Sequence, residues 1–341
     1  MSTQTSAAPR PAAAPLGTAR LSVLDRALTR EGEHPATALR ETVDFARQAE
    51  ELGFHRFWVA EHHGVPGVAG SAPTVLAAAV AAATSRIRVG TGGVMLPNHR
   101  PLVVAEQFGV LESLHPGRID MGLGRSVGFT DGVRRALGVG KEAAEGFEEQ
   151  VAEVLRFFEG GGTVRALPAE GLRVPAFVLA VGSGASVAGR LGLPLVIAGH
   201  RDESRTLRAI ESYRASFVAS AQCAVPYVVV AVNAAVAATA EEAERLQTSE
   251  AWATVESRTR GVFAPLLPPE EVAGRPMTPR EASLYEEARG SQLRGTAAEM
   301  RATLSALVAR TGADELLLTL NTYEPAARWD SYARLARLAG L

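Results

Sequence analysis

Short apolar runs alternate with helical patterns along most of the chain, from about residue 19 onward. We expect a helix over residues 36–51, for example, because Leu39, Val43 and Ala46 share one face at helical spacing before Gly53 ends the segment. Strands that alternate with helices in this way are parallel. Eight apolar runs are expected to form the strands: residues 21–24, 54–59, 87–94, 118–123, 176–181, 193–198, 226–232 and 315–320. The predicted fold class is therefore α/β, a (β/α)8 TIM barrel, in preference to an open doubly wound sheet.

The remaining helices follow these runs in order. We expect them over residues 73–84, 101–114, 143–158, 185–191 and 202–219, from about 239, from Thr296 with Glu299 completing a capping box, and over 329–338. Residues 248–293 do not fit a strand–helix unit, because they are charged and include five prolines. This stretch follows the seventh predicted strand and should project from the catalytic face. We interpret it as a lid insertion, with an inert excursion as the alternative.

Composition limits the size of the core and the class of partner. The chain has 341 residues, 47% of them apolar, which suffices for one domain over residues 19–341, with residues 1–18 expected to be a disordered tail. The net charge of -2 and the lack of a basic stripe argue against nucleic acid. No apolar run approaches the roughly 20 residues of a membrane span. A single cysteine, Cys223, forbids an internal disulfide and favours a reducing, cytoplasmic location.

Four candidate motifs fall where predicted strands end, the face on which TIM barrels carry their chemistry. The first is Glu61-His62-His63. A histidine there can donate a proton to a reacting oxygen, or accept one, near neutral pH. The alternative is a solvated polar turn. No metal site is expected, because spacings such as H-E-x-x-H are missing and neither His99 nor His115 suggests a cluster.

Glycines mark the other three motifs. Gly90-Thr91-Gly92-Gly93 lies inside the third predicted strand, where glycines indicate a barrel bend or a close backbone approach to a ligand. Gly122-Leu123-Gly124-Arg125-Ser126 ends the fourth strand and places Arg125 at the rim, suited to a phosphate or a ring carbonyl. Gly182-Ser183-Gly184 precedes a helix, so its backbone N–H groups either hold an anion such as phosphate or form a plain tight turn.

The fourth strand also admits a rival interpretation. Residues 124–128 read G-R-S-V-G and match G-x-S-x-G, the nucleophile elbow of α/β-hydrolases. That fold needs an acid and then a histidine later in the chain, and only His200 follows Ser126. The alternation of eight units also disagrees with a hydrolase sheet, so we favour the barrel.

Three longer segments resemble a known family. WVAEHHGVPG (58–67), RIRVGTGGVMLPNHRPLVVAEQFGVLESLHPGRIDMGLGR (86–125) and GADELLLTL (312–320) closely resemble bacterial luciferase-like monooxygenases, which include single-chain members that tailor aromatic polyketides in actinobacteria. The resemblance covers about residues 19–341. It implies a (β/α)8 barrel that binds reduced FMN, or coenzyme F420 in some branches, at its C-terminal mouth.

The resemblance also assigns roles to the motifs. His62 matches the active-site histidine, with Glu61 and His63 in the same catalytic turn. Gly92-Gly93 match a pair that often carries a non-proline cis peptide behind the flavin ring. Arg125 matches an arginine near the flavin, and residues 182–184 match the loop that holds the flavin phosphate.

Three departures from the family pattern lie where substrate would sit. The chain reads GLGRSVG at residues 122–128, where relatives often have GLGRAPG. It has Asn321-Thr322-Tyr323 where many relatives carry a histidine, and Asp25-Arg26 in place of a small polar pair. These changes leave the flavin assignment standing and the substrate open.

The function implied by the resemblance is a two-component, FMN-dependent monooxygenase. A separate flavin reductase would supply FMNH2, and O2 would give a C4a-hydroperoxyflavin that oxygenates an apolar small-molecule substrate, including in polyketide antibiotic biosynthesis. Two alternatives stay open: an F420-dependent hydride-transfer oxidoreductase, and a flavin-binding protein without catalysis. Members often dimerise through helices beside the second and third strands, so a homodimer is expected.

Overall fold

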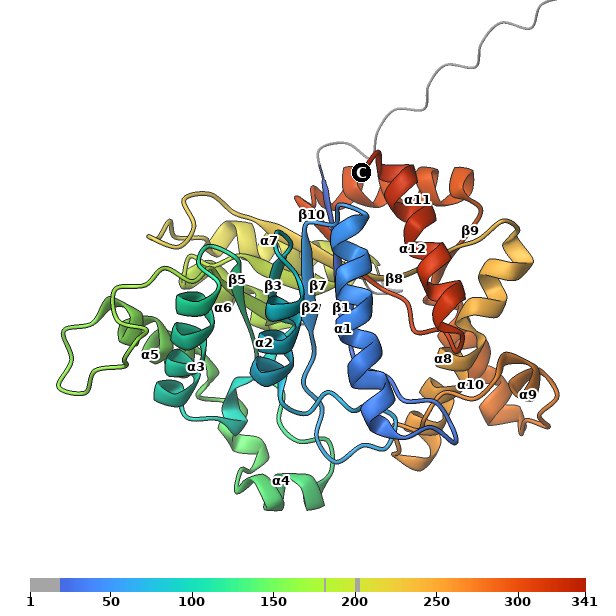
Figure 1. Cartoon of the computed structure of the whole chain (residues 1–341), viewed down its shortest axis with the longest axis horizontal. Helices are drawn as coiled ribbons and strands as arrows, with labels where there is room; N and C mark the ends of the chain where they lie inside the picture. The colour runs from blue at the N-terminus through green and yellow to red at the C-terminus, as the bar shows by residue number, and fades with distance from the viewer. Residues whose placement is uncertain (1–18, 181, 200–202) are drawn as a thin grey trace, which may run out of the picture.

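Eight parallel strands close into a barrel in the computed structural model, which describes residues 19–180, 182–199 and 203–341 (Figure 1). The barrel strands are β1 (Arg20–Asp25), β2 (Arg56–Val59), β3 (Arg88–Thr91), β5 (Ile119–Gly124), β6 (Ala176–Ala180), β7 (Leu195–Ala198), β8 (Val228–Val236) and β10 (Glu315–Thr319). Closure comes from β10, which pairs in parallel with both β1 and β8. The predicted TIM barrel is confirmed, and each predicted strand is present.

Helices connect consecutive strands around the outside of the barrel. They are α1 (Pro35–Glu51), α2 (Pro73–Ala83), α3 (Pro101–Leu114), α5 (Phe147–Glu159), α6 (Ala185–Arg190), α7 (Glu203–Ser216), α11 (Ala297–Thr311) and α12 (Pro325–Ala339). The helix predicted from residue 143 begins instead at Phe147, after a separate 3-10 turn, η2 (Lys141–Ala144). The capping box of α11 is confirmed, because the carboxylate of Glu299 accepts a hydrogen bond from the Thr296 N–H at 2.8 Å.

Side chains alternate between the two faces of each strand, as the pleat requires. On β2, Phe57 and Val59 pack against the surrounding helices, whereas Trp58 belongs to a separate cluster. That cluster also contains Phe177 and Leu317 from other strands. The barrel interior is therefore filled by large side chains and is a core, not a pore.

A buried ion network lies at the start of the strands. Arg56 pairs with Asp120 at 2.7 Å and with Glu315 at 3.0 Å, and Arg88 pairs with the same Asp120 at 2.6 Å. Both carboxylates are fully buried, so each charge is matched by an opposite one. Because this network and the Trp58 cluster occupy the amino-terminal half of the barrel, space for a ligand is left at the carboxyl ends of the strands.

The stretch between β8 and β10 is a helical excursion. It consists of α8 (Ala240–Arg260), a loop, α9 (Pro269–Ala273), α10 (Pro279–Gly290) and the short strand β9 (Leu293–Gly295), which pairs with β8. The predicted boundary at residue 248 falls inside α8. In Figure 1, α9 and α10 of this excursion lie at the lower right and α4 (Asp131–Leu137) at the bottom, toward the side where the barrel strands end. Among the described residues, no helix combines the length and apolar character needed to cross a membrane.

Candidate functional site

A cavity of about 460 Å³ opens at the carboxyl ends of the strands. Most of its wall is apolar, and the polar groups converge from several strand ends. The sequence-predicted residues that line it are Glu61, His62, His63, Gly92, Gly93 and Arg125. The structure therefore brings three of the four predicted motifs into one site.

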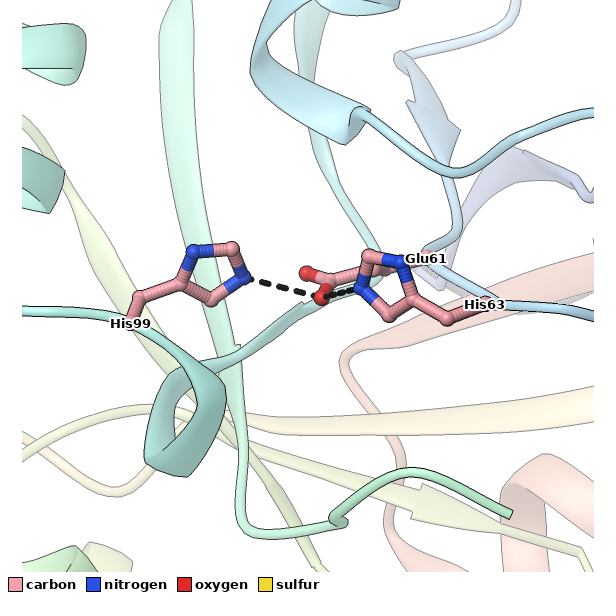
Figure 2. A group of neighbouring side chains, drawn as sticks. All are labelled: Glu61, His63 and His99. Atoms are coloured by element: carbon pink, nitrogen blue, oxygen red, sulfur yellow. Dashed lines mark hydrogen bonds and ion pairs between the residues drawn. The ribbon is translucent and has the colours of Figure 1, made fainter. Parts of the chain in front are cut away.

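Glu61 is a buried carboxylate held by two histidines (Figure 2). Its Oε1 faces Nε2 of His63 at 2.6 Å and Nε2 of His99 at 2.8 Å, while its Oε2 accepts the Met95 N–H at 2.9 Å. Burial alone would raise the pKa of Glu61, but the hydrogen bonds from the two histidines outweigh it and lower the pKa to about 2. Because an ionised carboxylate only accepts, both Nε2 atoms must carry hydrogens. Glu61 thus fixes the rings of both histidines.

The expectation that His99 joins no cluster was wrong. One donor atom from each of Glu61, His63 and His99 lies within 4.8 Å of the others, a grouping that resembles a metal site. Hydrogen bonds of 2.6 and 2.8 Å join both rings to Oε1 of Glu61. We call this hydrogen-bonded grouping the Glu61 clamp.

His62 does not take part in the Glu61 clamp. Its Nδ1 is buried and has no hydrogen-bond partner among the described residues. Its ring lies 6.0 Å from the ring of Phe263. Burial, followed by the positive charge of Arg26, lowers the pKa of His62 to about 4. At neutral pH this imidazole is therefore uncharged, with one N–H to donate and one lone pair to accept a proton.

A wall without side chains forms one side of the cavity. The Gly92–Gly93 peptide is cis, as the family resemblance implies. A Cβ on Gly92 would lie 2.5 Å from Cδ1 of Leu24, and one on Gly93 would lie 2.7 Å from the carbonyl oxygen of Gly122. Backbone packing therefore demands glycine at position 93, whereas a side chain at position 92 would require Leu24 to shift. The same bend divides the third predicted strand into β3 and a short β4 (Val94–Met95).

Two arginines flank the predicted phosphate turn. Arg125 is exposed after β5 and has no hydrogen-bond or ion-pair partner among the described residues. The turn is η3 (Gly182–Gly184); a Cβ on Gly184 would lie 4.0 Å from Cδ of Arg125, and one on Gly182 would lie 3.4 Å from Nη2 of Arg205. Arg125 lines the cavity, whereas Gly182, Gly184 and Arg205 do not, and the side chain of Ser183 lies outside the described residues. Sequence reasoning missed Arg205, which belongs to no motif.

Aromatic side chains from two distant loops meet over the cavity. Phe129 follows β5 and Phe263 lies between α8 and α9; their rings are 4.7 Å apart at 76°. The Phe263 carbonyl accepts the Gly67 N–H at 2.7 Å, which ties the excursion to the loop that carries the histidines. Neither ring was predicted as a site residue.

The hydrolase interpretation was wrong, because Ser126 lies on an irregular loop of a closed barrel; His200 is outside the described residues.

Two of the departures from the family pattern converge on one carboxylate. Glu250, on α8, accepts a hydrogen bond from Asn321 at 2.5 Å and pairs with Arg26. Asn233, on β8, donates to its other oxygen. The start of the excursion is thus tethered to the barrel mouth by residues that were singled out separately in the sequence.

Comparison with known proteins agrees with the fold and the motifs. Residues 20–318 match the sequence model of luciferase-like monooxygenases. The chain is 42% identical to the uncharacterized protein YvbT of Bacillus subtilis (strain 168) over 321 residues, which cover 93% of this chain and 95% of that protein. It is 37% identical to a luciferase-like monooxygenase of Escherichia coli (strain K12) over 322 residues, which cover 92% and 95%. The crystal structure of apo-MsnO8 aligns with a TM-score of 0.86 and 32% identity, covering 95% of this chain and 98% of that one. The chain therefore belongs to the luciferase-like monooxygenase family, and this membership supports a flavin-dependent monooxygenase.

Proposed function

We propose that the chain is the oxygenating component of a two-component system, which receives reduced FMN from a separate reductase and uses O2 to oxygenate an apolar organic substrate. The observation that carries this proposal is the cavity, which combines the Gly92–Gly93 wall, the neutral His62 and Arg125, which has no partner within the described ranges. When bound, FMN would supply the activation of oxygen. The protein would orient the flavin and the substrate, exclude water from the site and provide charged groups.

The residues present fit FMN. A flat ring system needs a wall without side chains, and Gly92 and Gly93 provide one where they line the cavity. A phosphate needs cationic and N–H donors, which Arg125, Arg205 and the Gly182–Gly184 turn offer at one rim of the cavity. The volume of about 460 Å³ lies within the range of small-molecule sites, roughly 300–1,000 Å³.

The protein's own groups divide the work. His62, uncharged at neutral pH, holds or accepts a proton beside the reacting oxygen. Glu61 keeps the His63 ring in one orientation at the cavity wall. Phe129 and Phe263 cover the mouth and keep water out, and we propose that the excursion carrying Phe263 acts as a lid.

The main alternative is a hydride-transfer enzyme that uses F420. The oxygenating constituent of 3,6-diketocamphane monooxygenase from Pseudomonas putida, in complex with FMN, shares the fold at 16% identity and a TM-score of 0.71. An F420-dependent secondary alcohol dehydrogenase shares it at 16% identity and 0.68, so fold alone does not choose between the cofactors. We favour FMN and oxygenation because N-acetyl-S-alkylcysteine monooxygenase of Bacillus subtilis is 46% identical over 142 residues, 40% of this chain and 42% of that protein.

Anaerobic titration tests the choice of cofactor. The protein is mixed with reduced FMN or with reduced F420, and binding is followed by the fluorescence of each cofactor and by filtration. We expect reduced FMN to bind at least about tenfold more tightly. Tighter binding of reduced F420, with turnover of an alcohol in the absence of oxygen, would reject the proposal in favour of the alternative.

We also propose a homodimer, formed through α2 and α3. Apolar side chains on the outside of these helices are exposed, among them Val75 (69%), Val110 (47%) and Leu114 (66%). Large apolar side chains exposed on neighbouring helices support an interface between chains at this face. We further propose a cytoplasmic location and a role in antibiotic biosynthesis. The second proposal is supported by 4-hydroxyprotoasukamycin monooxygenase of Streptomyces nodosus subsp. asukaensis, which is 38% identical over 93 residues, 27% of this chain and 25% of that protein.

A further inference from the structure

A second cavity of about 130 Å³ adjoins the main one. His62 and Phe263 line both cavities and form the partition between them. The polar side chains that line only the smaller one include Arg26, Glu250 and Arg258. We call this smaller cavity the side chamber. Its volume equals that of about four waters, enough for one small polar group and the carbon that carries it.

The carboxylate that lines the side chamber is already engaged by three hydrogen-bond donors. Glu250 is its only carboxylate among the described residues, and its side chain is 12% exposed. One oxygen of Glu250 accepts from Arg26 and Asn321, and the other accepts from Asn233. A ligand that arrives with a hydrogen-bond donor therefore finds this carboxylate occupied.

Donors, by contrast, are left over. The Arg26 side chain is 28% exposed and donates to Glu250 through one terminal nitrogen, while its other nitrogens have no hydrogen-bond partner among the described residues. A guanidinium carries five N–H donors, so most of its capacity is unused. Within the described ranges, Arg258 also donates through one nitrogen only, toward Glu287. The side chamber is thus suited to a group that accepts hydrogen bonds and carries negative charge.

The position of His62 links this chamber to the chemistry. Its buried Nδ1 has no partner in the described part of the chain, and the ring stands between the two cavities. A molecule that reaches from one cavity into the other must pass beside this ring and Phe263. The group in the side chamber therefore sets which part of the molecule faces the main cavity.

We propose that the side chamber binds a carboxylate of the substrate through Arg26, so that the substrate is an apolar molecule with an acidic end. This inference rests on the proposed function in one respect, because it places the apolar part of the same molecule beside the flavin site. Arg26 is a specificity-determining residue in this view. Glu250 and its amide partners hold the guanidinium in place.

Three eight-carbon probes test the inference by calorimetry on the full chain: octanoate, octanamide and octylamine. We expect octanoate to bind at least about tenfold more tightly than octanamide, with octylamine the weakest, because charge-assisted hydrogen bonds exceed neutral ones by about that factor. Arg26→Gln should abolish the advantage of octanoate over octanamide. Arg26→Lys keeps the charge and should retain part of it, which separates recognition from a general loss of folding.

Arg280→Gln is the matched control, because Arg280 is exposed on α10 and does not line the side chamber. It should leave all three affinities unchanged. Equal affinities for octanoate and octanamide, or an unchanged preference in Arg26→Gln, would overturn the inference. Reoxidation of protein-bound reduced FMN is measured on the same samples. A normal flavin reaction without carboxylate preference rejects only the side chamber, whereas a carboxylate preference without any flavin reaction rejects only the proposed function.

Discussion

Replacing Glu61 by glutamine probes the Glu61 clamp directly. Glutamine has nearly the same shape as the protonated acid but lacks the charge that accepts hydrogen bonds from His63, His99 and the Met95 N–H. Lowering the pKa of Glu61 from 4.5 to about 2 corresponds to about 3 kcal/mol in favour of the ionised form. One histidine can change tautomer and accept a hydrogen bond from the new amide N–H, which recovers part of the lost stabilising free energy. We therefore expect Glu61→Gln to reduce the free energy of unfolding by about 2–3 kcal/mol at pH 7.

The assay is urea denaturation followed by tryptophan fluorescence, with Glu51→Gln as the control because Glu51 is exposed at the end of α1. The sign of the pH dependence is fixed, since the pKa is lower in the folded chain. The difference between wild type and Glu61→Gln should be full above pH 4.5 and shrink as the pH falls toward 2. A loss below 0.5 kcal/mol at pH 7, or a difference that grows in acid, would refute the assignment of Glu61 as an ionised acceptor.

The other site residues give further tests. His62→Ala should lower the oxygenation rate at least about tenfold throughout pH 6–8, and the wild-type rate should show no ionisation of His62 there, since its pKa is near 4; a rate profile with a His62-dependent break near pH 6.5 would contradict this. Arg125→Gln should weaken FMN binding about tenfold and leave riboflavin, which lacks the phosphate, unaffected in a fluorescence titration; an equal loss for both would place Arg125 elsewhere. Phe263→Ala should raise the hydrogen peroxide released per flavin oxidised, as water enters the site; an unchanged yield would remove Phe263 from the roof. Leu114→Glu should turn the dimer into a monomer by light scattering; a persistent dimer would move the interface away from α3.

Local periodicity accounts for most of the fold that could be predicted. The patterns that predict strands and helices depend on residues close together in the sequence. All eight strands and the capping box of α11 were therefore placed correctly. The predicted strand and helix boundaries were wrong where contacts between residues distant in the sequence determine the end of an element. The third predicted strand is divided at Gly92–Gly93 into β3 and β4, at a point where Leu24 and Gly122 from other strands leave little room for a side chain.

The candidate site was predictable where motifs lie at strand ends. Glu61 and His62 lie in the loop that follows β2, and Arg125 directly follows β5, so the barrel places them at one mouth. His99 was not predicted as a partner of Glu61 because it comes 38 residues later in the sequence, and only the closed barrel brings the two side chains together. Phe263 lies 201 residues after His62, whose ring it neighbours. No local sequence pattern predicts how the excursion that carries Phe263 packs on the barrel.

The division of labour within Glu61-His62-His63 also depends on tertiary structure. The motif alone suggested one catalytic turn, but adjacent side chains face different surroundings. His63 is bonded to the Glu61 carboxylate, whereas His62 is buried beside Arg26 and Phe263 without a partner for Nδ1. The two histidines therefore have different hydrogen-bonding surroundings.

Stopped-flow mixing of the protein with reduced FMN and then with oxygenated buffer is the most direct test of the proposed oxygenase. We expect flavin reoxidation at least about tenfold slower than for free reduced FMN, through a transient whose absorbance matches neither reduced nor oxidised FMN, and a shorter-lived transient in His62→Ala. Reoxidation at the rate of free flavin, with immediate release of one hydrogen peroxide per flavin, would contradict the proposal that this cavity protects and directs the reaction of FMN with oxygen.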